Sequence, residues 1–182
     1  MTIATARLLL RPWREADFEP VAAMFADAIV MRYFDRTRTQ AQTRAWLDRV
    51  QAHFTAHRFG LWAVEIPGEA PFIGFVGLST VPTSLPIAPA TEAVWTLAQA
   101  FWGHGYAGEA ARAAIDDGFA RLGLREIVAF TAAVNTPSRR VMAKIGMRHA
   151  AGEAFDHPAI AEGHELRNHV VYRIRPDATP KV

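Results

Sequence analysis

The 182-residue sequence contains no cysteine. This absence excludes disulfide bonds, thiolate metal ligands and a cysteine nucleophile. It is compatible with a reducing cytoplasm, the location that we predict. Long apolar runs are missing as well, because the run of leucines near the N-terminus is broken at once by Arg11 and Pro12. We therefore expect neither a signal peptide nor a membrane span.

An excess of charge of one sign is also absent. The sequence has 20 Lys and Arg against 18 Asp and Glu, a formal net charge of +2, and the basic residues are scattered. Such a balance leans weakly toward anionic ligands and argues against a nucleic-acid surface. With 51% hydrophobic residues and no low-complexity segment, the chain is expected to be globular. Its length fits a single domain over 1–182.

Periodicity and turn residues predict a series of strands and helices along the chain. Thr39 and Gln42 form a capping box at the start of a helix that Gly60 is expected to end. A proline-rich loop covers 82–90. The predicted strands are 5–13, 61–66, 72–81, 91–99, 125–134 and 165–176, and the predicted helices are 14–34, 39–59, 108–122 and 135–145. This order indicates an α/β or α+β domain with a mixed sheet.

A glycine-rich turn joins the strand 91–99 to the following helix. In "WGHGYAGEA", Gly103, Gly105 and Gly108 have the spacing G-x-G-x-x-G. Backbone N–H groups at such a turn favour a phosphate, although a tight turn that only serves packing is the plain alternative. The following strand lacks the terminal acidic residue of a dinucleotide site, and no lysine precedes Lys144 to complete a P-loop. Neither nucleotide fingerprint fits.

The segments "FWGHGYAGEAARAAIDDGF" and "NTPSRRVMAKIGM" resemble the acetyl-CoA-binding core of the GNAT superfamily of N-acetyltransferases. The branch that contains the ribosomal-protein alanine N-acetyltransferases is most similar, and "RLLLRPWREADF" and "FIGFVGL" extend the resemblance over most of the chain. The family's motif [QR]-x-x-G-x-[GA] falls on Trp102, Gly105 and Ala107, where Trp102 departs from Gln or Arg. The resemblance implies a GNAT fold: a mixed, mostly antiparallel sheet of about seven strands with splayed central strands and four helices.

The resemblance also implies acetyl-CoA as co-substrate. The backbone of Leu97 and Ala98 would bind the pantetheine arm and polarise the thioester carbonyl. Asn135 would contact the pantetheine or acetyl end, although it also reads as a helix N-cap. Ser138 is a candidate acid for the leaving thiolate, with local capping as the alternative, and Arg139 would reach a CoA phosphate unless it is simply solvated. The pyrophosphate would be cradled by the main-chain N–H groups of Gly103, His104, Gly105, Tyr106, Ala107 and Gly108.

Acetyl transfer to an amine requires a group that accepts the amine proton. Glu92, at the head of the strand 91–99, is our candidate base, acting directly or through water. A solvated carboxylate at a strand end is the plain alternative, and Glu65 and Glu69 are rivals. Without cysteine, direct attack in a ternary complex is the simpler mechanism.

The histidines His157, His164 and His169 lie close in sequence without the spacing of a metal site, so we expect no metal. Instead, the segment 155–173 is expected to form a loop and a closing strand that shape the acceptor site. Trp46, on an apolar helix face, is expected to be core.

We therefore predict an acetyl-CoA-dependent N-acetyltransferase acting on a primary amine. A peptide N-terminus, favoured slightly, a polyamine and an amino sugar all remain open as acceptors. Two other classes are weighed: a non-catalytic acyl-CoA-binding or sensing module on the same fold, and a nucleotide-binding regulator. The resemblance is also compatible with a homodimer.

Overall fold

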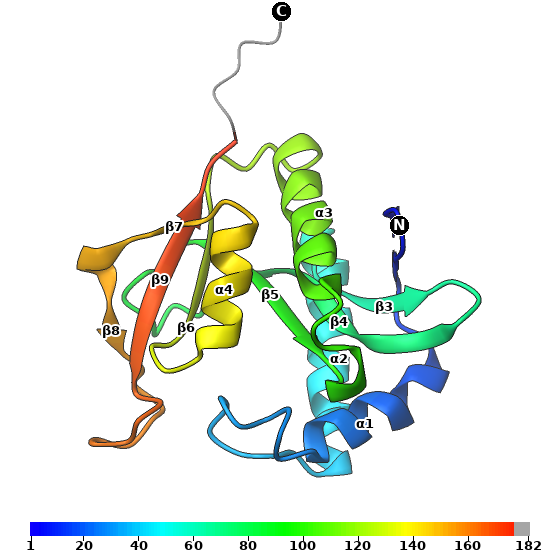
Figure 1. Cartoon of the computed structure of the whole chain (residues 1–182), viewed down its shortest axis with the longest axis horizontal. Coiled ribbons are helices and arrows are strands. Elements are labelled where there is room, and N and C mark those ends of the chain that lie inside the picture. The colour runs from blue at the N-terminus through cyan, green and yellow to red at the C-terminus, as the bar shows by residue number, and fades with distance from the viewer. Residues whose placement is uncertain (177–182) are drawn as a thin grey trace, which may run out of the picture.

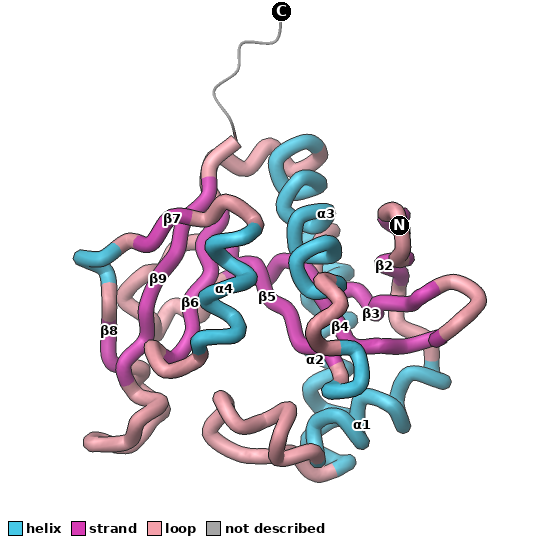
Figure 2. The backbone as a smooth tube through the Cα atoms, in the orientation of Figure 1, coloured by secondary structure: helices cyan, strands magenta, loops and turns pink. Residues whose placement is uncertain are grey.

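The structure is a computed structural model that describes residues 1–176. Figures 1 and 2 show a central sheet with helices on both faces. The helices are α1 (Phe18–Ala26), α2 (Gln40–His57), α3 (Tyr106–Ala120) and α4 (Thr136–Lys144), with 3-10 turns η1 (Glu15–Asp17), η2 (Gln99–Phe101) and η3 (Ala151–Glu153). The strands are β1 (Ile3–Ala4), β2 (Leu9–Arg11), β3 (Leu61–Ile66), β4 (Ala70–Thr80), β5 (Thr91–Leu97), β6 (Ile127–Ala132), β7 (Arg148–His149), β8 (Phe155–Asp156) and β9 (Asn168–Ile174).

The sheet has the order β1-β2-β3-β4-β5-β6-β9-β7, and β8 pairs with β9. All described pairs are antiparallel except β5 with β6. The mixed, mostly antiparallel sheet and the four helices confirm the predicted fold class. The sheet has nine strands where about seven were expected, and three of the nine, β1, β7 and β8, are each only two residues long.

The sheet splits between β5 and β6. These two parallel strands are paired at a single position, Glu92 with Val128. Beyond it they separate, as the ribbon shows (Figure 1). The splay that the family resemblance implied is therefore present, and it leaves one side of β5 without a partner strand.

Side-chain alternation along the strands builds a separate apolar layer on each face of the sheet. Trp62 and Val64 of β3 pack on the α3 side, where alanines of α3 let the helix approach closely. Leu61 and Ala63 pack on the α1 and α2 side. Trp46 belongs to this second layer, with its ring 4.8 Å from that of Phe75, which confirms it as core.

Two features fix the central strands. Arg11 in β2 is 2% exposed and binds Asp17 at 2.8 Å and Glu65 at 2.6 Å, which ties β2 to η1 and β3. Gly74 in β4 has φ +143, and a Cβ there would lie 2.3 Å from the carbonyl oxygen of Thr96 in β5. Only glycine fits this close approach of β4 to β5.

Two predicted helix ends are corrected. The helix expected over 14–34 ends at Ala26, because the side chain of Asp27 accepts a hydrogen bond from the N–H of Ile29 at 2.7 Å, a turn that competes with the helix. α2 ends at His57 and not at Gly60, because the following residue, Arg58, adopts a left-handed conformation with φ 62. The predicted capping box of Thr39 and Gln42 is confirmed.

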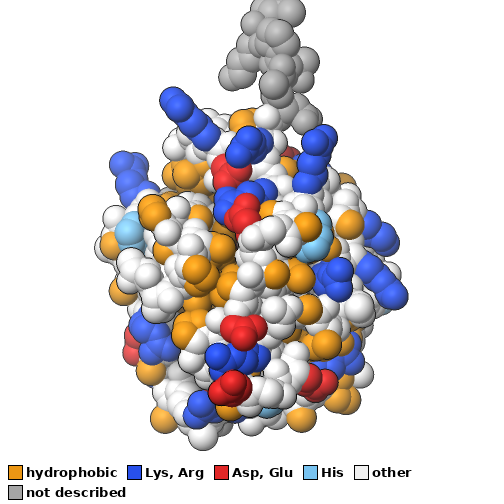
Figure 3. Space-filling view, turned by 90° about the vertical axis from the view of Figure 1, so that its left-hand side faces the viewer, with side chains coloured by type: hydrophobic (Ala, Val, Ile, Leu, Met, Phe, Trp, Pro, Cys, Tyr) orange, Lys and Arg blue, Asp and Glu red, His pale blue; other side chains and the backbone are white. Residues whose placement is uncertain are grey.

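No helix of the described residues is long and apolar enough to cross a membrane. On the face that carries β7, β8 and β9, basic and acidic side chains are interspersed around a band of apolar ones (Figure 3). This mixture of signs follows from the nearly balanced composition.

Candidate functional site

A cavity of about 730 Å³ opens where β5 and β6 diverge. Its walls come from β5, the glycine turn, α4, the loop between α1 and α2, and the segment around β8 and β9. Of the catalytic and cofactor-binding residues predicted from the sequence, Ala98, His104 and Arg139 do not line the cavity, and those that do are Glu92, Leu97, Gly103, Gly105, Tyr106, Ala107, Gly108, Asn135 and Ser138. The splay thus brings together residues that lie far apart in the chain.

The glycine turn presents unpaired donors. Gly103 and Gly105 have φ +81 and +83, and Gly105 is the N-cap of α3 without a side chain to cap it. The first bond into the helix runs from the Glu109 N–H to the Gly105 carbonyl at 3.1 Å. None of the N–H groups from Gly103 to Gly108 donates to an acceptor among residues 1–176. Such a set of donors at a helix N-terminus fits an anion, as the sequence predicted.

Arg7, which the sequence did not single out, braces this turn from behind. Its Nη1 donates to the His104 carbonyl at 3.0 Å, and its Nε donates to Glu109 at 2.7 Å. Thr5 also donates to Glu109 at 2.6 Å. Burial acts to raise the pKa of Glu109, but the hydrogen bonds from Thr5 and Arg7 outweigh it and lower that pKa. Glu109 therefore stays ionised, and the positive charge of Arg7 compensates its negative charge beside the glycine turn.

The free edge of β5 alternates in its backbone direction. The Ala98 N–H donates to the Ile73 carbonyl at 2.9 Å, so Ala98 points toward β4. In an antiparallel ladder the intervening residues point the other way, which turns the backbone of Leu97 and Trp95 toward the opening. The Leu97 carbonyl already accepts from the Trp102 Nε1 at 2.8 Å. The free donors are therefore the N–H groups of Leu97 and Trp95, and Ala98 is committed to the sheet.

The N-terminus of α4 forms the opposite wall. Asn135 is 8% exposed, and its Oδ1 accepts from the Ser138 N–H at 3.2 Å while its Nδ2 donates to Thr131 at 2.8 Å. Asn135 is therefore the helix N-cap, which confirms the structural alternative. The hydroxyl of Ser138 has no hydrogen-bond partner in the described part of the chain and lines the cavity.

Arg139 does not line the cavity. Its Nη1 donates to the Ala133 carbonyl at 2.9 Å and its Nε to the Tyr172 hydroxyl at 3.5 Å, which holds the guanidinium away from the opening. Arg140 and Lys144 line the cavity instead. The phosphate contact expected of Arg139 therefore finds no support, and helical spacing shows why: Arg140 and Lys144 are four residues apart and share the face that Arg139 lacks.

Glu92 is the cavity's titratable candidate. Desolvation by burial raises the pKa of its carboxyl from 4.5 to about 8. No hydrogen bond or ion pair joins this carboxyl to another described residue. Its rivals are elsewhere: Glu65 pairs with Arg11, and Glu69 is exposed in the turn after β3. A carboxyl with a pKa raised into the neutral range is suited to general acid-base catalysis.

The far end of the cavity is lined by aromatic and imidazole rings. They are Tyr33, Phe34, Phe130, His157 and His169. The sequence had placed acceptor residues in 155–173, and two of its three histidines do line the cavity. The side chains of residues 1–176 form no cluster of three or more acidic or histidine residues that could hold a metal.

Several cavity residues had no signal in the sequence. Tyr33 and Phe34 were assigned to a helix, and only the loop that follows Asp27 turns them toward the opening. Arg32 reaches the cavity from the same loop, where its guanidinium lies 5.2 Å from the ring of Trp102. These contacts depend on tertiary placement, which periodicity does not encode.

A splayed sheet, an uncapped phosphate-sized turn and a cavity between them define the class of the protein: an acyltransferase of the GNAT type. The chain belongs to this family, because the model described as "Acetyltransferase (GNAT) domain" matches residues 7–148. Acetyl-CoA is the co-substrate of GNAT acetyltransferases, and a structural neighbour contains CoA.

Two relatives are similar to this chain in sequence over most of its length. "Uncharacterized N-acetyltransferase YnaD" of Bacillus subtilis is 30% identical over 96% of this chain and 96% of its own. "FsC-acetyl coenzyme A-N(2)-transacetylase" of Aspergillus fumigatus is 34% identical over 81% of this chain and 65% of its own. The chain thus spans about two thirds of the fungal protein.

Two solved structures bear on the fold. An acetyltransferase of the GNAT family from Bacillus anthracis has a TM-score of 0.78 and 30% identity, with 96% of this chain and 98% of that chain covered. Spermidine N-acetyltransferase from Vibrio cholerae, in complex with CoA and spermine, has a TM-score of 0.74. It is 17% identical and covers 94% of this chain and 96% of its own, so it shows the fold alone.

Proposed function

We propose that the chain transfers the acetyl group of acetyl-CoA to a primary amine by direct attack in a ternary complex. The observation that carries this proposal is one shared cavity: the unpaired N–H groups of the glycine turn and the desolvated carboxyl of Glu92 open onto the same space. The first group fits a phosphate and the second fits an amine.

The donor set fits CoA from end to end. The N–H groups of 103–108 hold the pyrophosphate, and Arg140 and Lys144 add positive charge on the facing wall. The outward-facing backbone of Leu97 pairs with the pantetheine arm as an added strand would. Asn135 keeps one amide hydrogen free beside this path, since the other binds Thr131.

The position of Glu92 changes which backbone N–H group we assign to the thioester carbonyl. Leu97 follows Glu92 by five residues, about 16 Å along a strand, which is too far for both to act at one carbonyl. Trp95 is about 10 Å along the strand from Glu92, within reach of a carboxylate and one water. We therefore assign the Trp95 N–H to the carbonyl and the Leu97 N–H to the pantetheine.

Acetyl-CoA supplies the thioester whose C–S bond breaks as the N–C bond forms. Glu92, directly or through water, accepts the proton that the amine nitrogen loses. The Trp95 N–H stabilises the charge that develops on the carbonyl oxygen. The hydroxyl of Ser138 donates a proton to the departing sulfur and is reprotonated from solvent.

The acceptor is proposed to be a small-molecule amine or a peptide α-amine. The name of the fungal relative indicates an amine at a nitrogen called N(2), and one protein of the same fold is a spermidine N-acetyltransferase. A single domain, a cytoplasmic location and a homodimer stay predictions.

Thermal unfolding with acetyl-CoA, CoA, NAD and ATP tests the binding step. Saturation at a hundred times the dissociation constant adds about 2.7 kcal/mol to the free energy of unfolding. We expect stabilisation by acetyl-CoA and CoA only, followed by CoA release with an amine panel. Stabilisation by NAD or ATP instead would favour the nucleotide-binding regulator. Stabilisation by CoA without acetylation of any amine would favour the non-catalytic module.

Ser138→Ala tests the proposed acid. The capping bond uses the backbone N–H of Ser138, so this variant keeps the cap of α4 and its thermal stability. We expect kcat to fall by about tenfold to a hundredfold. Thr136→Ala, a hydroxyl removed from the exposed side of the same turn, is the matched control. Equal activity of the two variants would remove Ser138 from the mechanism.

A further inference from the structure

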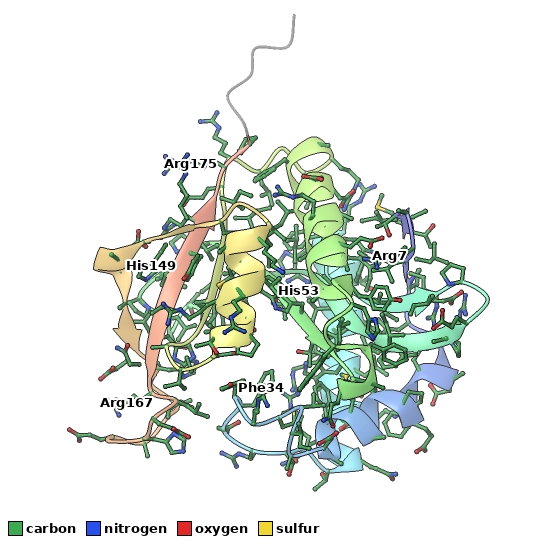
Figure 4. All side chains as sticks on the ribbon, in the orientation of Figure 1. Arg7, Phe34, His53, His149, Arg167 and Arg175 are labelled. Carbon is green, nitrogen blue, oxygen red and sulfur yellow. The ribbon has the colours of Figure 1, made fainter. Side chains whose placement is uncertain are left out.

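The acceptor end of the cavity has a wall of flat, uncharged rings. Phe34 stands on the loop between α1 and α2 and faces the opening between the two halves of the sheet (Figure 4). Tyr33 lines the cavity from the same loop, and Phe130 lines it from β6. His157 and His169 complete this wall, with their ring centroids 4.9 Å apart.

Part of this apolar surface is unpacked. Phe34 is 40% exposed and Trp102 is 36% exposed, and both line the cavity. Large aromatic side chains left open at a cavity mark a ligand-binding surface more than a structural one.

Burial disfavours the charged form of both imidazoles. The Nδ1 of His157 accepts from the Ala159 N–H at 3.2 Å, which places its proton on Nε2. The Nδ1 of His169 lies 3.1 Å from the Arg167 carbonyl, to which it donates. Burial lowers the pKa of both histidines below 6.5. Stacking of Phe155 on His169, with centroids 5.6 Å apart, holds this wall in place.

Charge in the cavity disfavours an acceptor with a second cation. Glu92 is the one carboxylate among the described lining residues, and the direct attack assigns it to the reacting amine. Arg32, Arg140 and Lys144 also line the cavity, without an ion pair to any described residue. Asp35, whose charge acts on His157, lies outside the lining and pairs with Arg36 at 2.8 Å.

We propose that the acceptor is a primary monoamine with a flat aromatic body, and that the cavity discriminates against diamines and polyamines. The aromatic body lies against Phe34, Phe130 and the imidazoles while its amine reaches Glu92. A second ammonium would find neutral rings and Arg32 where it needs a carboxylate, and a buried unpaired charge is costly. This inference rests on the proposed amine acetylation and adds its substrate class.

Three primary amines separate the two parts of the inference: 2-phenylethylamine, hexylamine and 1,5-diaminopentane. Hexylamine and the diamine have similar length and differ by a terminal ammonium, whereas 2-phenylethylamine differs from hexylamine by its aromatic ring. We expect kcat/KM to fall by about tenfold from 2-phenylethylamine to hexylamine and again by about tenfold from hexylamine to the diamine. A diamine as good as hexylamine would overturn the inference.

Phe34→Asp is the specificity switch. It places a carboxylate at the ring wall, so we expect the kcat/KM ratio of the diamine to hexylamine to rise by about tenfold. The matched control is Ile29→Asp, which adds the same charge on the same loop at a residue that is 46% exposed and outside the cavity lining. An equal rise in both variants, or none in Phe34→Asp, would contradict the proposed wall.

Binding by calorimetry to the CoA-loaded protein separates this inference from the function that it deepens. If CoA binds but no amine is acetylated, the proposed function fails, while the order of the three dissociation constants still tests the cavity. Dissociation constants that rise in the order 2-phenylethylamine, hexylamine, 1,5-diaminopentane support the inference. The reverse order refutes it even if all three amines are acetylated.

Discussion

Replacing Glu92 by glutamine removes the one carboxylate of the described cavity lining while keeping its shape. Burial raises the pKa of this group from 4.5 to about 8, so the folded state holds a proton that the unfolded state releases within that range. The free energy of unfolding of the wild type therefore falls as pH rises through this window. Glutamine does not titrate, and the variant lacks this loss.

The magnitude follows from the size of the pKa change. At about 1.36 kcal/mol for each pKa unit, a rise from 4.5 to about 8 corresponds to a ceiling of about 5 kcal/mol. Because Glu92 lines an open cavity, solvent can screen one side of its carboxylate. We therefore expect about 2 kcal/mol, equivalent to a change of about 4 to 8 °C in Tm for a chain of this size.

Urea unfolding near pH 5 and near pH 9 measures this effect. Glu92→Gln is expected to gain stability relative to wild type between the two conditions. Glu69→Gln is the control, because Glu69 is exposed in the turn after β3 and lies outside the main cavity. If the difference between wild type and Glu92→Gln is the same at both pH values, the carboxyl is not desolvated and the reasoning fails.

The same variant tests the proposed base through its rate. A base must be deprotonated, so kcat/KM of the wild type is expected to rise with pH to a plateau above about 8. Glu92→Gln should lose this limb and most of its turnover. If Glu92→Gln removes the pH dependence of stability but leaves the pH–rate profile unchanged, Glu92 is a buried carboxyl without a catalytic role.

Three further predictions concern the support of the site. Arg7→Ala should raise the dissociation constant of acetyl-CoA about tenfold in calorimetry, with partial recovery when Glu109→Gln removes the exposed charge; an unchanged constant would contradict the brace. Asp17→Asn should cost about 3 kcal/mol in urea unfolding, because it leaves buried Arg11 short of a partner; a loss below about 1 kcal/mol would argue against this ion pair. Gly74→Ala should cost about 2 to 4 kcal/mol by the same measurement, and full stability would refute the close approach of β4 and β5.

Local signals predicted much of the fold. The Thr39 and Gln42 capping box and the glycine turn at 103–108 depend on near neighbours and are confirmed. The end of the first helix at Ala26 was missed because a single hydrogen bond, accepted by the side chain of Asp27 from the Ile29 N–H, overrides a favourable apolar pattern. The end of α2 was missed because Arg58, a non-glycine residue, adopts the left-handed conformation.

The site was predictable where the backbone alone forms it. The cradle needs only glycines before a helix, and Glu92 was singled out because it lies at the head of the strand that lines the cavity. Arg139 was chosen over Arg140 because sequence spacing gives neighbours on a helix but not the direction of the face toward the sheet. The aromatic wall was invisible because it joins the loop at 27–39 to β6 and β9.

The order of groups along β5 explains why one strand can serve both substrates. Its pairing with β6 stops at Glu92, so the outward-facing N–H groups of Trp95 and Leu97 beyond that point are free for a ligand, whereas the Leu97 carbonyl is bound by Trp102. Trp95 and Leu97 are two residues apart, about 7 Å, and the glycine turn begins just after them, so an extended arm with its phosphates at 103–108 runs back toward Glu92. In the proposed complex, the thioester end would then lie near Glu92, where the strands part. The aromatic wall lines the same cavity as Glu92, so the shape and charge of the acceptor should decide specificity.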